Sequence, residues 1–381
     1  MNELSAREAS AFLVGHLGLR RFEGRGAAGA RALLEKLRCI QLDPLDPMGT
    51  NADLVAMARV RDLKRGDIYR HLYPGHAFEH FAKERCLLPA SAFPSYRNRC
   101  AETRWWRHGE RLERLPEGLV EEVLEEVRAR GPLSASDLAD RGSVAPIDWQ
   151  GWTSTSRAGS MALDVLWTRC QIVVCGRTAR GKVYDVPERA LPLVARGTPA
   201  PDFFRWGVVE RVEAAGLLAR SGGATWSMLS EARKNGVVDA LVAEGAIEEV
   251  RVEGSARRYL APRGFRDRRH PRADGRVRIL GPLDPLLWDR ELVRQAFGFE
   301  YIWEVYKPAA QRRWGWYVCP LLAGDALVGR IDAAIDGSAL RVKRLWLERE
   351  VEPALVSAAL DRHRAACGAD RVVLPRGKTR A

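Results

Sequence analysis

The segment Cys39–Pro44 contains the residues best suited to chemistry, because a carboxamide and a carboxylate stand two positions apart in it. Apolar and polar residues alternate and a proline closes the segment, which predicts a short strand leaving a helix. On a strand, Gln41 and Asp43 project to the same side. Such a pair can hold and deprotonate one water, and can offset positive charge that develops on a sugar. Asp before Pro is also ordinary turn chemistry, and Asp46-Pro47 repeats it.

Other common catalytic and metal-binding motifs are missing from the sequence. It contains no G-x-x-x-x-G-K, no G-x-G-x-x-G after a strand and no H-E-x-x-H. The histidines are not grouped at metal-ligand spacing, so we expect His71, His76 and His80 to be loop or hairpin residues. The seven cysteines form no C-x-x-C pair and are odd in number, which favours reduced core thiols over a disulfide framework or a zinc ribbon. We therefore expect neither a cofactor nor a metal.

Composition and charge indicate a folded protein with a polyanionic partner. Of the 381 residues, 46% are hydrophobic and 29% charged, and an excess of Lys and Arg makes the net charge +12. Nucleic acid is the commonest polyanion in a cell, although Arg-rich usage also accompanies GC-rich genomes. The N-terminal stretch reads as an amphipathic helix rather than a signal peptide, and no apolar run reaches the ~20 residues of a membrane span. We expect a cytoplasmic, nucleoid-associated monomer that does not contact membranes.

Helical spacing predicts the first elements of an α+β chain. Ser5 and Glu8 form a capping-box pattern at the start of one helix, and Leu33, Leu34 and Leu37 belong to a second helix that leads into the Cys39–Pro44 strand. Between residues 119 and 186 the pattern predicts three helices followed by a β-hairpin: helices from 119 to Gly131-Pro132, from Ser134 with Asp137 as its capping partner, and over 159–169, then strands through 172–174 and 183–186. That order is typical of a winged helix.

The same pattern returns later in the chain. Helices from 208 and over 237–242 precede strands through 247–250 and 259–260. At one constant offset, three residues of the first hairpin correspond to three of the second: Ile172, Tyr184 and Pro187 to Ile247, Tyr259 and Pro262. We interpret this as a repeated winged-helix module. The predicted organisation is a winged helix with the catalytic motif at 1–115, a second at 116–200, a third at 201–265 and a β-rich C-terminal domain at 275–381.

Basic residues gather in the second half of the chain. Nine arginines lie between Arg257 and Arg278, either as a solvated linker or as a seam that contacts phosphates. Residues 301–306 and 314–318 alternate like the strands of a hairpin around a basic tip. Predicted DNA contacts on wings and turns are Arg157, Arg180, Lys182, Arg257, Arg258, Arg312 and Arg313.

Four segments, in order along the chain, resemble motifs of one protein family. The first is Ile40–Leu45, with the sequence IQLDPL, and the second is Leu280–Arg290, with LGPLDPLLWDR. The third is Glu304–Ala310, with EVYKPAA, and the fourth is Leu327–Asp332, with LVGRID. They are similar to motifs of the AlkZ/YcaQ family of winged-helix DNA glycosylases, and the resemblance extends from about residue 10 to 350.

The resemblance implies tandem winged helices around a basic channel for duplex DNA. It also implies hydrolysis of the N-glycosidic bond of N7-alkylated purines and unhooking of interstrand crosslinks in base excision repair. Gln41 and Asp43 then take the two catalytic positions, and Asp at the second position resembles the YcaQ branch. Lys83 stands where many relatives carry a histidine before the glutamate, which puts that histidine's role in doubt here.

Two interpretations without catalysis remain open from the residues. Winged helices are far more often transcriptional regulators than enzymes, and a fold does not choose between the two. A DNA-binding scaffold of a repair complex is the other alternative. Three tandem modules, a large C-terminal domain and no sensor-like segment count against the regulator.

Overall fold

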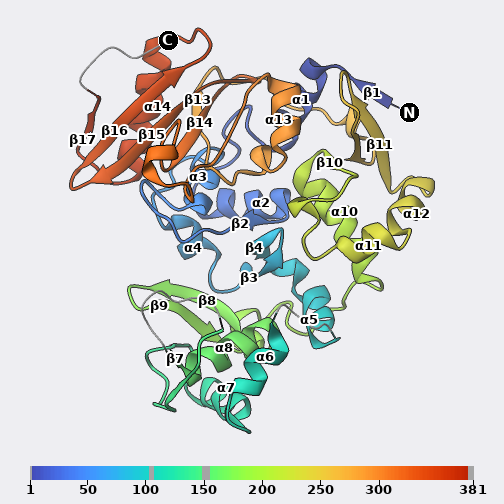
Figure 1. The fold of residues 1–381 in the computed structure, drawn as a ribbon, viewed down its shortest axis with the longest axis vertical. Helices are drawn as coiled ribbons and strands as arrows, with labels where there is room; N and C mark the ends of the chain where they lie inside the picture. The colour runs from blue at the N-terminus through green and yellow to red at the C-terminus, as the bar shows by residue number, and fades with distance from the viewer. Residues whose placement is uncertain (1, 103–106, 148–154, 376–381) are drawn as a thin grey trace. The chain divides into compact units, whose positions relative to one another are not determined.

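The computed structural model describes residues 2–102, 107–147 and 155–375 and has an α+β fold (Figure 1). It divides into two compact units. The first comprises residues 1–71, 81–86 and 204–381, and the second comprises residues 72–80 and 87–203. Among the described residues, no helix is both long enough and apolar enough to cross a membrane.

The N-terminal elements of the first unit confirm the local predictions. They are β1 (Asn2–Leu4), α1 (Ala6–His16), α2 (Gly26–Leu37), β2 (Ile40–Gln41), α3 (Asn51–Met57) and α4 (Asp67–Leu72). Ser5 and Glu8 close a capping box on α1, with the Glu8 carboxylate 2.8 Å from the Ser5 nitrogen. In α2 the three predicted leucines are buried, which holds the helix that leads into β2. β2 belongs to a three-stranded sheet with β3 (Ala77–Ala82) and β4 (Glu84–Pro89), in the order β2-β4-β3.

The second unit contains most of the predicted helix-and-hairpin pattern. Its further elements are η1 (Ala90–Ala92), α5 (Phe93–Glu102), α6 (His108–Arg114), α7 (Leu119–Arg130), β5 (Leu133–Ser134), β6 (Ser143–Val144), β7 (Ser156–Arg157), α8 (Ala158–Thr168), β8 (Val173–Thr178), β9 (Gly181–Asp185) and α9 (Pro187–Ala190). The predicted helix from Ser134 is wrong. Asp137 instead accepts hydrogen bonds from the Ser134 nitrogen and hydroxyl at 2.9 and 2.6 Å, which closes a turn.

The middle of the first unit repeats the sheet of the second. It contains α10 (Phe203–Ala215), β10 (Leu218–Ala219), η2 (Ala224–Trp226), α11 (Ser230–Lys234), α12 (Val237–Ala243), β11 (Ile247–Val252) and β12 (Arg258–Pro262). β10-β12-β11 has the same antiparallel order as β5-β9-β8. β8 contains a bulge, and beyond it Gly176 pairs with Val183. When the constant offset found in the sequence is added to both residues, this pair becomes Arg251↔Arg258, which is also a pair in the second sheet. The two sheets therefore share their strand order and, at this pair, their register.

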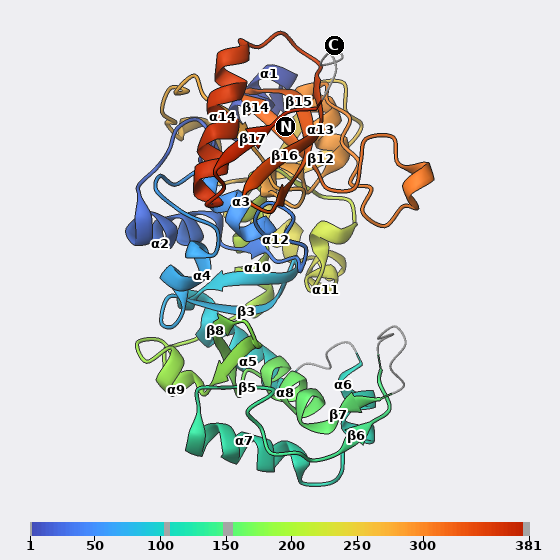
Figure 2. The same ribbon diagram turned by 90° about the vertical axis from the view of Figure 1, so that its left-hand side faces the viewer.

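The C-terminal part of the first unit is β-rich, as predicted. Its elements are η3 (Phe265–Asp267), β13 (Val277–Ile279), η4 (Pro285–Leu287), α13 (Arg290–Phe297), η5 (Ala309–Gln311), β14 (Val318–Ala323), β15 (Ala326–Asp336), β16 (Ala339–Leu347), α14 (Pro353–Ala366) and β17 (Arg371–Val373). The five strands form one sheet in the order β13-β14-β15-β16-β17, and α14 lies against it (Figure 2). Met48 and Leu54 join the core of this sheet, so the N-terminal segment and the sheet share one core.

The predicted hairpin over 301–318 is wrong. Residues 301–317 form a loop that is organised by Glu304, whose side chain is completely buried. Its carboxylate accepts hydrogen bonds from the main-chain nitrogens of Trp314 at 2.7 Å and Arg313 at 3.2 Å, and pairs with Lys307 at 2.9 Å. Burial opposes its ionisation, but these donors outweigh the burial and lower the pKa of Glu304 to about 2. The ionised Glu304 carboxylate thus binds both ends of the loop together, and no strand pairing is needed.

Candidate active site

Gln41 is the last residue of β2 and is buried. Its main-chain oxygen accepts a hydrogen bond of 2.8 Å from Nδ2 of Asn51, the first residue of α3. Asn51 is itself completely buried, and its Oδ1 accepts a 3.0 Å hydrogen bond from the main-chain nitrogen of Leu283. The end of β2 is thus held by two other segments of the first unit, so the Gln41 side chain leaves a fixed backbone.

Lys83 occupies the single position between β3 and β4, where a lysine usually extends into water. Here it is only 7% exposed, and its Nζ donates a 2.8 Å hydrogen bond to Oε1 of Gln41. An ammonium group can only donate, so the carboxamide oxygen faces Lys83 and the NH₂ group of Gln41 is left to donate elsewhere. Burial lowers the pKa of Lys83, and the charge of Arg290 lowers it further.

Asp43 lies beyond the strand, so the expected alternation of Gln41 and Asp43 on one β-strand is wrong. The reason is local. Oδ1 of Asp43 accepts a 2.9 Å hydrogen bond from the main-chain nitrogen of Leu45, and this turn redirects the chain at Pro44. The side chain is half-buried, and burial raises the pKa of Asp43 although the hydrogen bond from Leu45 opposes the shift.

The second Asp-Pro dipeptide has a different environment. Asp46 accepts a 2.9 Å hydrogen bond from the Gly49 nitrogen and forms an ion pair of 2.6 Å with Arg65. Within the described residues, no Lys, Arg or His forms an ion pair with Asp43. Of the two aspartates, Asp46 is therefore neutralised by the protein, whereas Asp43 keeps an uncompensated charge.

Two aromatic residues of the C-terminal part border these groups. Tyr317 is 1% exposed, and burial raises the pKa of its hydroxyl, with the charges of Cys319 and Asp43 adding to the shift. Among the described residues, none forms a hydrogen bond with this hydroxyl. The Lys83 Nζ lies 5.4 Å from the centroid of the Trp288 ring, within cation–π range. Gln41 and Asp43 are thus surrounded by segments far away in sequence.

The segment Leu280–Arg290 contacts residues that follow β2 and α3 in the first unit. Gly281 is required by space, since a Cβ at this position would lie 2.4 Å from Oδ1 of Asn51. Asp284 and Arg59, both with completely buried side chains, form a two-pronged ion pair of 2.7 and 2.9 Å. Arg59 also donates a 2.6 Å hydrogen bond to the main-chain oxygen of Leu17. This motif therefore joins the C-terminal part to α1 and α3.

The segment Leu327–Asp332 supports the loop that follows α13. The Arg330 guanidinium lies between the rings of Phe299 and Trp314, at 4.3 and 3.9 Å from their centroids. Gly315 packs so closely on Asp332 that a Cβ would lie 2.2 Å from its Oδ2. These contacts hold the loop in position.

The predicted DNA contacts already have acceptors in the protein. Arg180, 71% exposed at the β8–β9 turn, pairs with Asp137 at 2.9 Å. Lys182 is turned inward, with its Nζ 3.9 Å from Glu79 and 5.8 Å from the Trp167 ring. The remaining contacts are Arg157 to the Ala135 oxygen, Arg257 to Asp289, Arg258 to Glu249, Arg312 to the Lys307 oxygen and Arg313 to Glu300. Of those that form an ion pair, Arg180 is the most exposed. Lys182 faces Glu79, with which Arg177 forms a shorter ion pair.

Comparison with known proteins decides between an enzyme and a regulator. The family model "DNA glycosylase AlkZ-like" matches residues 34–369, a stretch that contains Gln41, Asp43, Lys83 and the three C-terminal motifs. The chain belongs to the AlkZ-like DNA glycosylase family. The structure of Streptomyces sahachiroi DNA glycosylase AlkZ has the same fold, with a TM-score of 0.61 at 16% identity, covering 98% of this chain and 100% of that one. The AlkZ-like chain is a DNA glycosylase, and DNA is its partner.

The sequence predicts the motif at Gln41 and Asp43 but not the residues that surround it. In the sequence Lys83 is marked only by its departure from the family's histidine and Trp288 only by its place in the second motif, and neither Asn51 nor Tyr317 is marked as a site residue. A lysine in a two-strand turn gives no indication that it points inward. The sequence predicts reduced core thiols, and loop or hairpin positions for His71, His76 and His80; His71 instead lies in α4, and the fold brings His80 of β3 together with two of the thiols.

Proposed function

We propose that this AlkZ-like glycosylase hydrolyses the N-glycosidic bond of N7-alkylated purines, including those of interstrand crosslinks, with Gln41 and Asp43 at the catalytic centre. The observation that carries the proposal is the half-buried Asp43 carboxylate, which no described cation compensates, two residues from an amide that Lys83 orients. Alkylation at N7 makes the purine cationic, so the base departs without a general acid. The enzyme needs only a positioned water and a negative charge beside an oxocarbenium-like sugar.

In this proposal Asp43 supplies the charge and accepts the proton of the attacking water. Its Oδ1 is held by the Leu45 nitrogen, so Oδ2 receives the water. A pKa raised by burial makes the carboxylate a better base than an exposed aspartate. Gln41 positions the attacking water through its NH₂ group, because its amide oxygen already accepts a hydrogen bond from Lys83.

The wings and turns of the chain supply the DNA-binding surface in this proposal. The three winged helices are the segments 1–115, 116–200 and 201–265, and the last domain covers 275–381. The shared strand order of the two hairpin sheets supports the second and third modules. Exposed ion pairs such as Arg180–Asp137 have little stabilising effect, so phosphates can replace their acidic partners. Tyr306, 86% exposed beside Lys307, offers a ring for stacking on a base.

The test is base release from a duplex that carries one N7-methylguanine, measured under single-turnover conditions. Asp43→Asn should bind this duplex like the wild type, because it keeps shape and loses only charge. Its excision rate should fall at least about a hundredfold, the lower scale for removal of a positioned acid–base group.

Asp46→Asn is the matched control, since it removes the same charge from the neighbouring Asp-Pro dipeptide. The side chains of Asp46 and Arg65 are 32% and 37% exposed, so the ion pair that the variant loses is weak. The excision rate of Asp46→Asn should therefore change little. Wild-type excision by Asp43→Asn would place the catalytic centre elsewhere. Absence of excision by the wild type on both methylated and crosslinked duplexes would refute the substrate class.

A further inference from the structure

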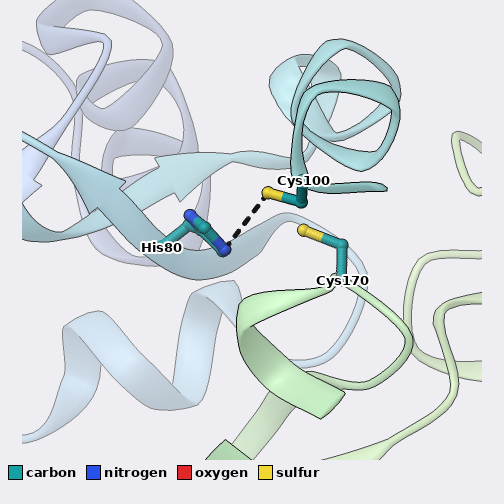
Figure 3. Close-up of side chains that lie close together, drawn as sticks. All are labelled: His80, Cys100 and Cys170. Carbon is teal, nitrogen blue, oxygen red and sulfur yellow. Dashed lines mark hydrogen bonds between the residues drawn. The ribbon is translucent and has the colours of Figure 1, made fainter. Parts of the chain in front are cut away.

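Three side chains with soft metal-binding atoms meet inside the second unit. His80 comes from β3, Cys100 from α5, and Cys170 follows α8 (Figure 3). All three are buried, and their ligand atoms lie within 4.8 Å of one another. Among the described residues, this is the group of His, Cys, Asp and Glu whose atoms converge closely enough to hold one metal ion.

The geometry of the group fits a tetrahedral zinc site. Zn–S and Zn–N bonds of about 2.3 and 2.1 Å at tetrahedral angles place S and N about 3.6 Å apart. Sγ of Cys100 lies 3.4 Å from Nε2 of His80, and Figure 3 shows the Cys170 sulfur pointing toward the same space. The main-chain oxygen of Thr168 lies 3.1 Å from the same nitrogen, at the spacing of a neighbouring ligand.

We propose that His80, Cys100 and Cys170 bind one structural zinc ion, with the Thr168 main-chain oxygen as fourth donor. Two thiolates and an imidazole are the ligand set that zinc prefers, and a closed, buried position is typical of structural sites. The ion would tie β3, the end of α5 and the end of α8 together. Glycosidic hydrolysis does not pass through it, so its effect is on the folding stability of the second unit.

Two other groups in the chain show what a pair without a third ligand looks like. Within the part of the chain that the structure describes, Cys39 and Cys86 are buried neighbours without a histidine close by, and Cys367 lies 3.5 Å from His363 without a second thiol. Both offer two soft donors, whereas His80, Cys100 and Cys170 offer three. Zinc binding that requires His80, Cys100 and Cys170 but neither of the two pairs would therefore identify the site.

The experiment measures metal in the full chain, purified reduced and without chelator. Elemental analysis should find about one zinc ion per chain, which Cys100→Ser/Cys170→Ser loses and Cys175→Ser, a thiol of the same unit on β8, keeps. Removal of zinc should lower Tm by several degrees, and added Zn²⁺ should restore it in the wild type but not in the double variant.

A second measurement avoids dependence on variants that fail to fold. The zinc-free wild type should bind Co²⁺ with a thiolate-to-cobalt absorption band and the visible bands of tetrahedral cobalt. Folded, fully reduced wild type that takes up neither Zn²⁺ nor Co²⁺ would overturn the proposal. Zinc retained in full by Cys100→Ser/Cys170→Ser would also overturn it.

Discussion

Replacement of Lys83 by Met tests whether the orientation of Gln41 matters for catalysis. Methionine has similar length and volume but removes the ammonium group that holds Oε1 of Gln41 at 2.8 Å. A hydrogen bond from a charged donor contributes about 1.5–3 kcal/mol. With tenfold in rate for each 1.36 kcal/mol, the excision rate should fall about 10- to 150-fold if the amide loses its orientation in the transition state. Burial lowers the pKa of Lys83, so the ion is itself unfavourable in the fold, and its removal should offset part of the stability lost with the hydrogen bond.

A double-mutant cycle with Gln41→Ala separates positioning from general damage. If Lys83 acts through Gln41, Lys83→Met should cost nothing further in the Gln41→Ala background. The alkaline decline of wild-type activity should begin below the ordinary range of lysine and be absent from Lys83→Met. Lys64→Met, at an exposed position, is the control with an unchanged rate. A wild-type rate for Lys83→Met, or equal losses in both backgrounds, would refute the reasoning.

Two further predictions concern the buried ion pair and the DNA surface. Asp284→Asn should lower the free energy of unfolding by about 3–5 kcal/mol in urea, because it leaves Arg59 charged and unpaired inside the protein. Arg59→Met/Asp284→Leu should recover much of that loss, and a single-variant cost below about 1 kcal/mol would contradict the pairing. Arg180→Ser should weaken binding to all duplexes and reduce the salt slope by about one unit, whereas Arg128→Ser, an exposed arginine on α7, should leave the slope unchanged. An unchanged slope for Arg180→Ser would remove the β8–β9 turn from the interface.

Where sequence patterns failed, a buried charge or a competing turn was responsible. Residues 301–318 alternate like strands, but Glu304 lies in the middle of the apolar run and gathers main-chain donors instead of facing solvent. Ser134 and Asp137 have the spacing of a helix cap, and the same hydrogen bonds close a turn when no apolar helical face follows. Asp43 lies outside β2 because its side chain binds the Leu45 nitrogen.

The sequence by itself determined the features that depend on neighbours along the chain. The capping box at Ser5, the leucine face of α2 and the two repeated hairpins all follow from spacing within a few residues. Only the tertiary structure decided which distant groups meet. Lys83 reaches Gln41 across 42 positions, and Asp284 reaches Arg59 across 225. His80, Cys100 and Cys170 converge from three elements. Such contacts leave no local pattern, because they depend on how separate elements pack and on which buried charges find partners.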